Sequence, residues 1–250
     1  MKRTHLFNLL FLITFVVAGT FEAFAYNFEV NGIYYNINSG YSTVYVTYKN
    51  TSYNSYSGVV TIPQTVTYNN KTYSVTSIGN SAFYGCTGLT SVTIPNSVTA
   101  IGQYAFSGCT GLTSVIIEGP ISIVKNETFK DCRKLKSVSL PYSVTLIENN
   151  AFYFCEELTD FTCLAKTPPV IERYNSIYPG YYMATLHVPQ RSVEAYRATD
   201  WWSHFISIVG DASDDNTTPA DAPVDKCDTN DDGEVNIADV NRVINAILNH

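Results

Sequence analysis

The strongest constraint on the fold is a short motif that recurs every 23 residues. Ala-Phe-x-x-Cys occurs at 82–86, 105–109 and 151–155, and the copy at 128–132 has Thr128 in the alanine position. Six further apolar columns keep the same spacing, among them Leu89/Leu112/Leu135/Leu158 and Val92/Val115/Val138/Phe161. One unit cannot bury its own apolar face, but stacked units bury each column as a continuous ladder. The sequence therefore predicts a solenoid.

Each unit contains a strand pattern followed by a return segment. Leu89, Val92 and Ile94 form a Leu-x-x-Val-x-Ile pattern, which predicts a short strand with these side chains inward, and Pro95 ends it. Residues 81–86 (Ser-Ala-Phe-Tyr-Gly-Cys) predict a return leg made of a single helical or 3₁₀ turn. We therefore expect an α/β repeat with a period of 23 residues over 75–163, in four units.

Two rows of side chains are predicted to point outward from these strands. They are Ser91/Ser114/Ser137/Asp160 and Thr93/Ile116/Ser139/Thr162. The face is flat, rich in hydroxyl groups and almost without charge. We predict that Thr93, Ile116, Ser139 and Thr162 form a ligand-binding face for a protein or a glycan. The alternative is that they are simply the solvated side of the sheet.

Residues 91–112 resemble the BspA-like leucine-rich-repeat family (Ser-Val-Thr-Ile-Pro-Asn-Ser-Val-Thr-Ala-Ile-Gly-Gln-Tyr-Ala-Phe-Ser-Gly-Cys-Thr-Gly-Leu). The resemblance extends over about 26–210. It implies a right-handed leucine-rich-repeat solenoid in a secreted or cell-surface protein, and in some members adhesion to host proteins or other cells. It does not imply catalysis.

Both ends of such a stack need a cap, because an end unit exposes its apolar columns. Residues 26–74 are rich in Tyr, Val and Thr and predict an N-terminal β cap of short antiparallel strands. In 164–210, residues 186–189 (Leu-His-Val-Pro) predict a final strand, and Ser192 predicts the N-cap of a short helix that ends near Arg197. Aromatic and apolar residues then cover the last unit: Trp201, Trp202, Phe205 and Ile208.

The N-terminus indicates export. Lys2 and Arg3 precede an apolar stretch from Leu6 to Val17, and residues 23–25 (Ala-Phe-Ala) fit a signal-peptidase site. We predict that 1–25 is a removed signal peptide and that the mature protein is extracellular, either secreted or associated with the cell surface. The apolar stretch is too short for a transmembrane anchor.

Charge is concentrated at the C-terminus. Residues 26–210 carry eleven acidic and eleven basic residues, whereas 211–250 carry ten acidic and two basic residues. A neutral body argues against nucleic-acid binding, which needs a basic surface. Residues 211–226 have no apolar periodicity and predict an acidic linker.

Residues 227–250 have the spacing of a calcium loop followed by a helix. Oxygen-bearing side chains occupy loop positions 1, 3, 5, 9 and 12, with Gly233 at position 6, as in EF-hands. The predicted ligands of one Ca²⁺ ion are the side chains of Asp228, Asn230, Asp232 and Asp239, the Glu234 carbonyl, and a water near Asn236. The alternative is a polar turn before a helix.

An aspartate at position 12 followed by one helix resembles a dockerin repeat, the calcium-dependent module that binds cohesin domains. A dockerin has two such repeats and this chain shows one. The resemblance implies a role in an extracellular assembly, which is the alternative function. The predicted helix presents an apolar face of Val240, Val243, Ile244, Ile247 and Leu248. We expect this apolar face to pack against a cohesin-like domain, a second copy of the tail, or the solenoid itself.

The cysteines and the absence of nucleophile motifs argue against an enzyme. Cys86, Cys109, Cys132 and Cys155 share one column, and their side chains point in parallel, so we predict free buried thiols rather than disulfides. Gly-x-Ser-x-Gly and phosphate-loop patterns do not occur in the sequence. His187 is predicted to point outward from its strand.

Overall fold

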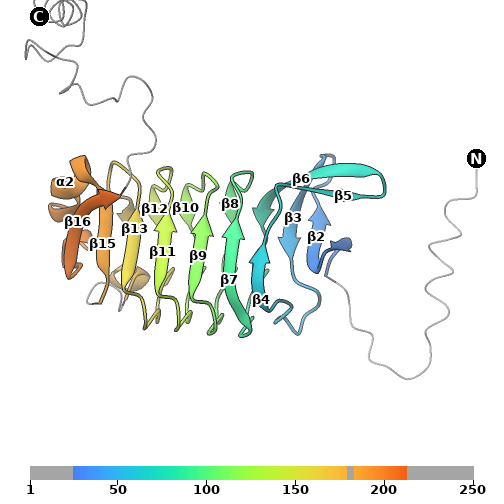
Figure 1. Cartoon of the computed structure of the whole chain (residues 1–250), viewed down its shortest axis with the longest axis horizontal. Helices are drawn as coiled ribbons and strands as arrows, with labels where there is room; N and C mark the ends of the chain where they lie inside the picture. Colours follow the sequence, from blue (N-terminus) through green and yellow to red (C-terminus); the bar gives the residue numbers. More distant parts are fainter. Residues whose placement is uncertain (1–24, 179–182, 213–250) are drawn as a thin grey trace, which may run out of the picture.

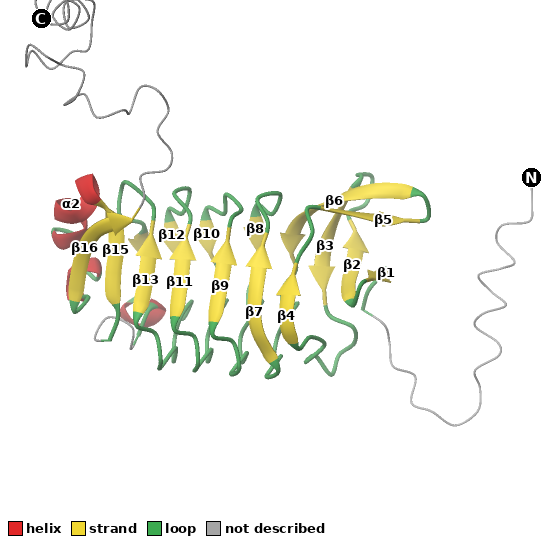
Figure 2. Cartoon of the chain, in the orientation of Figure 1, coloured by secondary structure: helices red, strands yellow, loops and turns green. Residues whose placement is uncertain are grey.

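The computed structural model describes residues 25–178 and 183–212. The chain is an elongated stack in which the strands of one sheet stand side by side along the long axis (Figures 1 and 2). A second sheet of two-residue strands and a wall of turns complete each coil of the stack. A smaller sheet closes the N-terminal end, and short helices lie at the C-terminal end (Figure 2).

Seven parallel strands form the main sheet, in the order β16-β15-β13-β11-β9-β7-β4. Their bounds are β4 (Gly58–Thr61), β7 (Leu89–Ile94), β9 (Ser114–Ile117), β11 (Ser137–Leu140), β13 (Asp160–Cys163), β15 (Thr185–Pro189) and β16 (Ser207–Ala212). Val92, Val115 and Val138 lie side by side and are buried, as the column pattern predicts. The sheet extends into both predicted caps, since β4 precedes residue 75 and β15 and β16 follow residue 163.

The second wall consists of the two-residue strands β8 (Ala100–Ile101), β10 (Ile123–Val124), β12 (Leu146–Ile147) and β14 (Val170–Ile171). β10, β12 and β14 pair in parallel, and β8 pairs with β6 (Lys71–Ile78). Each of these strands buries one residue of the repeating isoleucine or valine column, namely Ile101, Val124, Ile147 and Ile171.

The predicted helical return leg is wrong, and the repeat is therefore not an α/β repeat. In the described repeats, the residues around each buried phenylalanine form turns. Alternate N–H groups donate to the next unit, as from Phe83 to Ala105 O (2.7 Å), Phe106 to Thr128 O (2.8 Å) and Phe129 to Ala151 O (2.8 Å). The N–H groups between them close single local turns, as from Cys86 to Phe83 O (3.1 Å). Because the alternate N–H groups are already used between units, a continuous helix cannot form.

The core contains a column of stacked rings and a column of thiols. The centroids of Phe83, Phe106, Phe129 and Phe152 are successively 4.7, 5.2 and 5.2 Å apart. Cys86, Cys109, Cys132, Cys155 and Cys163 are all buried free cysteines, which confirms the prediction of free thiols for this set. The thiol of Cys109 donates to the carbonyl oxygen of Phe83 (3.0 Å), and Cys132 and Cys155 repeat this contact one unit further on.

The N-terminal end is closed by β1 (Phe28–Val30), β2 (Ile33–Ile37), β3 (Thr43–Thr47), β5 (Thr65–Tyr68) and β6. Their order is β1-β2-β3-β6-β5, and all pairs are antiparallel except β3 with β6. The parallel pair is a difference from the predicted antiparallel cap. It arises because β6 already runs in the direction of the stack and pairs in parallel with β8.

The C-terminal end contains the helix α2 (Val193–Arg197) and the 3₁₀ turns η1 (Tyr174–Ser176), η3 (Gln190–Ser192) and η4 (Trp202–His204). The predicted final strand is not the last one, because β16 pairs with β15 after the helix. The Ser192 side chain makes no capping hydrogen bond. Ser192 is the last residue of η3 and has a helical backbone conformation, so the chain continues directly into α2. Trp202 and Phe205 are buried against Phe161, as predicted for the last unit.

Of the predicted signal peptide, only residue 25 is among the described residues, and of the predicted linker only residues 211–212 are. The predicted calcium loop and the helix after it lie outside the described residues. Within 25–178 and 183–212, no helix has the length and apolar character that crossing a membrane requires.

Candidate ligand-binding face

The outward side chains of the main sheet form two straight rows, because successive residues of a strand point to opposite faces. The register places Ser91, Ser114, Ser137 and Asp160 in one row and Thr93, Ile116, Ser139 and Thr162 in the other. We call these two rows the outer face. The structure thus brings together all four residues predicted to bind ligand, and β4 and β15 lengthen the second row with Thr61 and His187.

The outer face consists mainly of small side chains and is almost uncharged. The hydroxyl groups of Ser91 and Ser114 are 3.1 Å apart, so neighbouring strands share hydrogen bonds along the row. Ile116 is 51% exposed at the middle of the face, and smaller polar side chains flank it in its row. An exposed apolar side chain in a flat polar surface offers contact area that a partner can desolvate at low cost.

Charge enters the outer face at its C-terminal end. Nε2 of His187 lies 3.6 Å from Oδ1 of Asp160, and both side chains are partly exposed. The predicted outward orientation of His187 is confirmed, since its Cα is paired with that of Thr162 in the outward row. The Asp160 carboxylate also accepts a hydrogen bond from the Thr159 hydroxyl at 2.7 Å.

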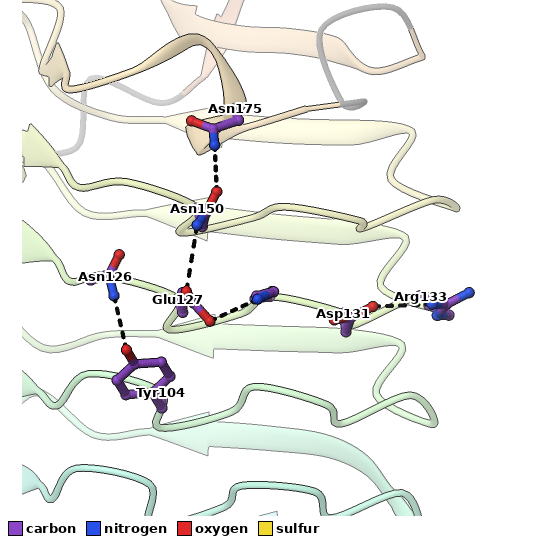
Figure 3. Close-up of polar contacts among 8 residues, drawn as sticks. Tyr104, Asn126, Glu127, Asp131, Arg133, Asn150 and Asn175 are labelled. Carbon is purple, nitrogen blue, oxygen red and sulfur yellow. Dashed lines mark hydrogen bonds and ion pairs between the residues drawn. The ribbon is translucent and has the colours of Figure 1, made fainter.

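The turn wall carries a different kind of surface, in which polar groups pair with one another (Figure 3). The Asn175 amide donates to Asn150 Oδ1 (2.6 Å), and the Asn150 amide donates to Glu127 Oε1 (3.4 Å). Lys130 Nζ lies 2.9 Å from the other Glu127 oxygen. Hydrogen bonding to Glu127 raises the pKa of Lys130, which partial burial opposes. The two asparagine contacts connect successive units, and the Lys130–Glu127 pair lies within one unit, so these polar groups have a structural role.

Chemistry beyond binding has little support in the described part of the chain. Among residues 25–178 and 183–212, no group of three or more His, Cys, Asp or Glu side chains is placed to hold a metal ion. Burial raises the pKa of every cysteine of the thiol column, so none of them is a reactive thiolate near neutral pH. The predicted calcium ligands Asp228, Asn230, Asp232, Glu234, Asn236 and Asp239 and the apolar helix face lie outside the described residues.

A groove beside β4 was not predicted from the sequence. It has a volume of about 660 Å³ and is lined by residues of the β1–β2 turn, the 55–57 segment, β4 and β5. Its residues belong to the N-terminal end, which precedes the first column of the repeat. The only sequence signal was the density of tyrosines there.

The comparisons with known proteins agree with the geometry. Residues 60–174 match the model of the BspA type leucine rich repeat region, in six copies, where four units were predicted. The chain is 23% identical to a leucine rich repeat protein of T. pallidum, with a TM-score of 0.52 and coverage of 66% of this chain and 72% of that one. This match shows the leucine-rich-repeat fold. No curated protein matches the sequence.

A second solved structure is a leucine-rich repeat protein from Bacteroides ovatus ATCC 8483. It is 24% identical, with a TM-score of 0.46, and the match covers 66% of this chain. The matched part of this chain spans 56% of that protein's length.

Proposed function

Because residues 60–174 form a BspA type leucine rich repeat region, we propose that this chain is a non-catalytic, adhesin-like binding protein that acts outside the cell. Its ligand is a protein or a glycan, and the outer face of the main sheet contacts it. Leucine-rich repeats stack into extended surfaces, which suit recognition of large ligands.

The observation that carries this proposal is the composition of the outer face. Its hydroxyl groups offer hydrogen bonds without the desolvation cost of buried charge. Ile116 supplies the apolar centre, and the partly exposed Ser91, Thr93 and Ser139 lie around it. Apolar anchors surrounded by polar contacts are the usual pattern of binding hot spots. In the turn wall, by contrast, Glu127, Lys130, Asn150 and Asn175 already bond to one another, so their polar groups are less available to a ligand.

The test is binding of the full chain to a glycan array and to immobilised extracellular-matrix proteins. Ile116→Lys places a charge at the centre of the outer face and is expected to weaken binding at least about tenfold. Tyr142→Lys is the matched control, because Tyr142 is an equally exposed apolar residue (55%) in a loop. Equal binding by both variants would contradict the proposal.

Export is tested separately, by sequencing the mature N-terminus. We expect it to begin at Tyr26, because the apolar stretch and the Ala-x-Ala site precede it. A mature protein that retains Lys2 would argue against secretion through a cleaved signal.

The C-terminal calcium loop is a second proposed function. Five acidic residues between 228 and 239 repel one another without a cation, so Ca²⁺ is expected to order the loop and the helix after it. The ordered helix then docks on a cohesin-like partner in an extracellular assembly. Calorimetry on the full chain is expected to show one Ca²⁺ site that is lost in the double variant Asp228→Ala, Asp232→Ala. Unchanged calcium binding by that variant would rule out this loop as the site.

A further inference from the structure

The last strand at the N-terminal end of the main sheet has an open edge. β4 pairs with β7 on one side, and the order of the sheet places no strand on the other. The Gly58 N–H donates to Gly88 O (2.8 Å), and the Ile62 N–H donates to Thr93 O (3.1 Å). Hydrogen bonding alternates along a strand, so the N–H and C=O groups of Val59 and Thr61 point away from β7.

These backbone groups have no partner within residues 25–178 and 183–212. An open row of this kind is a template for a further strand, and proteins usually protect it with a charged side chain or a covering element. β4 carries no charged residue. It is short and is followed by Pro63, so the open part is limited to four backbone groups on Val59 and Thr61.

The groove of about 660 Å³ runs beside this edge. Its lining includes the three residues Val59, Val60 and Thr61 of β4, and none of the residues that line it is acidic, basic or histidine. A charged segment would lose its hydration there without gaining an opposite charge, so the groove favours an uncharged occupant.

A buried tyrosine lies in the lining of the groove. Tyr35 lines the groove and is fully buried, and its hydroxyl has no hydrogen-bond partner among the described residues. An unsatisfied buried hydroxyl costs about 1–3 kcal/mol, so the packing beneath the groove is less favourable here than elsewhere in the core. The neighbouring Tyr56 shows the contrast: its hydroxyl accepts from the Tyr34 N–H (3.2 Å) and donates to the Thr47 carbonyl.

We propose that the groove beside β4 binds an extended, uncharged peptide segment of a partner protein, which adds to β4 as an eighth strand. The open groups of Val59 and Thr61 hold the peptide backbone. This mode of recognition needs only main-chain hydrogen bonds for affinity and pockets for alternate side chains for specificity. The site meets the outward row at Thr61, but it lies two strands away from the binding centre at Ile116 and does not use that residue.

The probe is the acetylated and amidated peptide Leu-Thr-Ser-Val-Thr-Ile. It has the sequence of β7, which already pairs with β4 across the opposite edge. Backbone amide exchange in the full chain is the readout. The amides of Val59 and Thr61 are expected to exchange at least about tenfold more slowly with peptide present, as amides do when they enter a ladder.

Two changes test whether the backbone edge is responsible. Thr61→Pro removes an open N–H that β7 does not use, so it is expected to weaken peptide binding about tenfold while the fold is kept. A peptide N-methylated at every residue has no backbone N–H to donate from either edge and is expected to fail with the unaltered protein, which keeps the test valid should the proline variant misfold. Ile116→Lys is the matched control, and it is expected to bind the peptide normally.

Three results would overturn the proposal. One is peptide binding that leaves the Val59 and Thr61 amides unprotected. Another is equal binding of the N-methylated peptide. The third is protection that rises with protein concentration in the absence of peptide, which would identify a second copy of this chain as the occupant. Loss of glycan or matrix binding in Ile116→Lys with peptide binding intact would support the two sites as independent.

Discussion

The two ends of the main sheet are closed in different ways. At the C-terminal end, η3 and α2 adjoin β16, and the Arg197 guanidinium donates to the carbonyl oxygen of Ile208 (3.4 Å). At the N-terminal end, the small sheet of β1, β2, β3, β5 and β6 covers the core, but it does not pair with β4. An end cap has to cover the apolar cross-section and also occupy the last strand's hydrogen-bonding groups. Among the described residues the first is met at both ends, whereas the second is met in part at the C-terminal end, through the Ile208 carbonyl, and not at β4.

Aromatic residues cover the cross-section at both ends. The Tyr56 ring lies 4.4 Å from Phe83, which begins the phenylalanine column. At the other end Phe152 meets Phe161 edge-on at 5.3 Å, and Phe161 in turn packs on Trp202 and Phe205. The apolar closure of the two ends is therefore alike, and the difference between them lies in the backbone edge.

The largest expected effect concerns the buried thiols, which are the column from Cys86 to Cys155 and Cys163 of β13. Burial raises the pKa of Cys86 at the N-terminal end to about 11, and burial likewise raises that of Cys163 at the C-terminal end to about 11. Burial raises the pKa values of the interior thiols Cys109 and Cys132 well above the ordinary value. The folded state holds these protons more tightly than the unfolded chain. The stabilising contribution of each thiol is thus full below pH 9, and that of Cys86 and Cys163 is lost as the pH rises toward 11.

Each such group lowers the free energy of unfolding by about 1.4 kcal/mol per pH unit in this window. Five thiols together are expected to unfold the solenoid in alkali, which denaturant titrations between pH 8 and 11 would measure. The double variant Cys86→Ala, Cys163→Ala should have a slope shallower by about 1.4 kcal/mol per pH unit for each cysteine removed. The same slope in the variant would show that the end thiols are not the groups that titrate first.

Trp202→Ala is expected to have the next largest effect, because it removes the centre of the C-terminal closure. Trp202 is fully buried, and its indole N–H donates to Pro169 O at 2.7 Å. Removal of a buried aromatic side chain costs about 3–5 kcal/mol. Chemical denaturation is the measurement, with the exposed Tyr142→Ala as control. A loss no greater than that of the control would mean that the C-terminal end closes without Trp202.

The sequence predicted the interior of the stack better than its ends, and the comparison of the ends explains why. Phe83, Phe106, Phe129 and Phe152 keep one spacing, so their stacking follows directly from the repeat. The pairs Val59–Ser91 and Asp160–Thr185 also lie side by side in the main sheet, yet they do not keep that spacing. Inserted residues in the connecting segments hide β4, β15 and β16 from a search for a fixed period, and β15 alone was predicted, from the Leu-His-Val-Pro pattern of residues 186–189.

Of the two candidate binding sites, the outer face was predictable from the repeat, and the groove beside β4 was not. The outer row of Thr93, Ile116, Ser139 and Thr162 follows from the alternation of side chains within strands whose register the repeat fixes. The groove beside β4 depends on how Tyr35 and Tyr56 fold back against the first unit. No column of the repeat contains these two residues, and their contacts are tertiary.

Tyr56→Phe tests the polar part of the N-terminal closure and has an intermediate expected effect. The change keeps the ring against Phe83 but leaves the Tyr34 N–H and the Thr47 carbonyl without the hydroxyl that links them. Leaving buried backbone groups unsatisfied costs about 1–3 kcal/mol. Amide exchange of Tyr34 and the free energy of unfolding would both report it, with Tyr142→Phe as the control. A neutral result would show that β2 and β3 repair the pair without the hydroxyl.

The smallest expected effect compares the turn walls of the two halves of the stack. One turn position has a positive φ in four successive units, occupied by Gly85 (+64°) and Gly108 (+73°) toward the N-terminal end and by Asp131 (+57°) and Phe154 (+61°) toward the C-terminal end. Glycine adopts this conformation freely, whereas a side chain makes it strained. At this one position the C-terminal units therefore carry a strain that the two N-terminal units avoid, although a second turn position has a non-glycine residue at positive φ in all four units, from Ser81 to Asn150.

Gly85→Ala isolates that strain, because a Cβ atom at Gly85 would meet no other atom within 4 Å. The expected loss is about 1 kcal/mol, and it comes from the backbone alone. Asp131→Ala is the matched control at the equivalent position: it keeps a Cβ at positive φ and removes only the exposed ion pair with Arg133, so a change within about 0.5 kcal/mol is expected. If both variants lose the same stability, the positive-φ turns are not strained. A loss in Gly85→Ala alone would show that the N-terminal end, already open along β4, also depends on its glycine to keep the first turn in place.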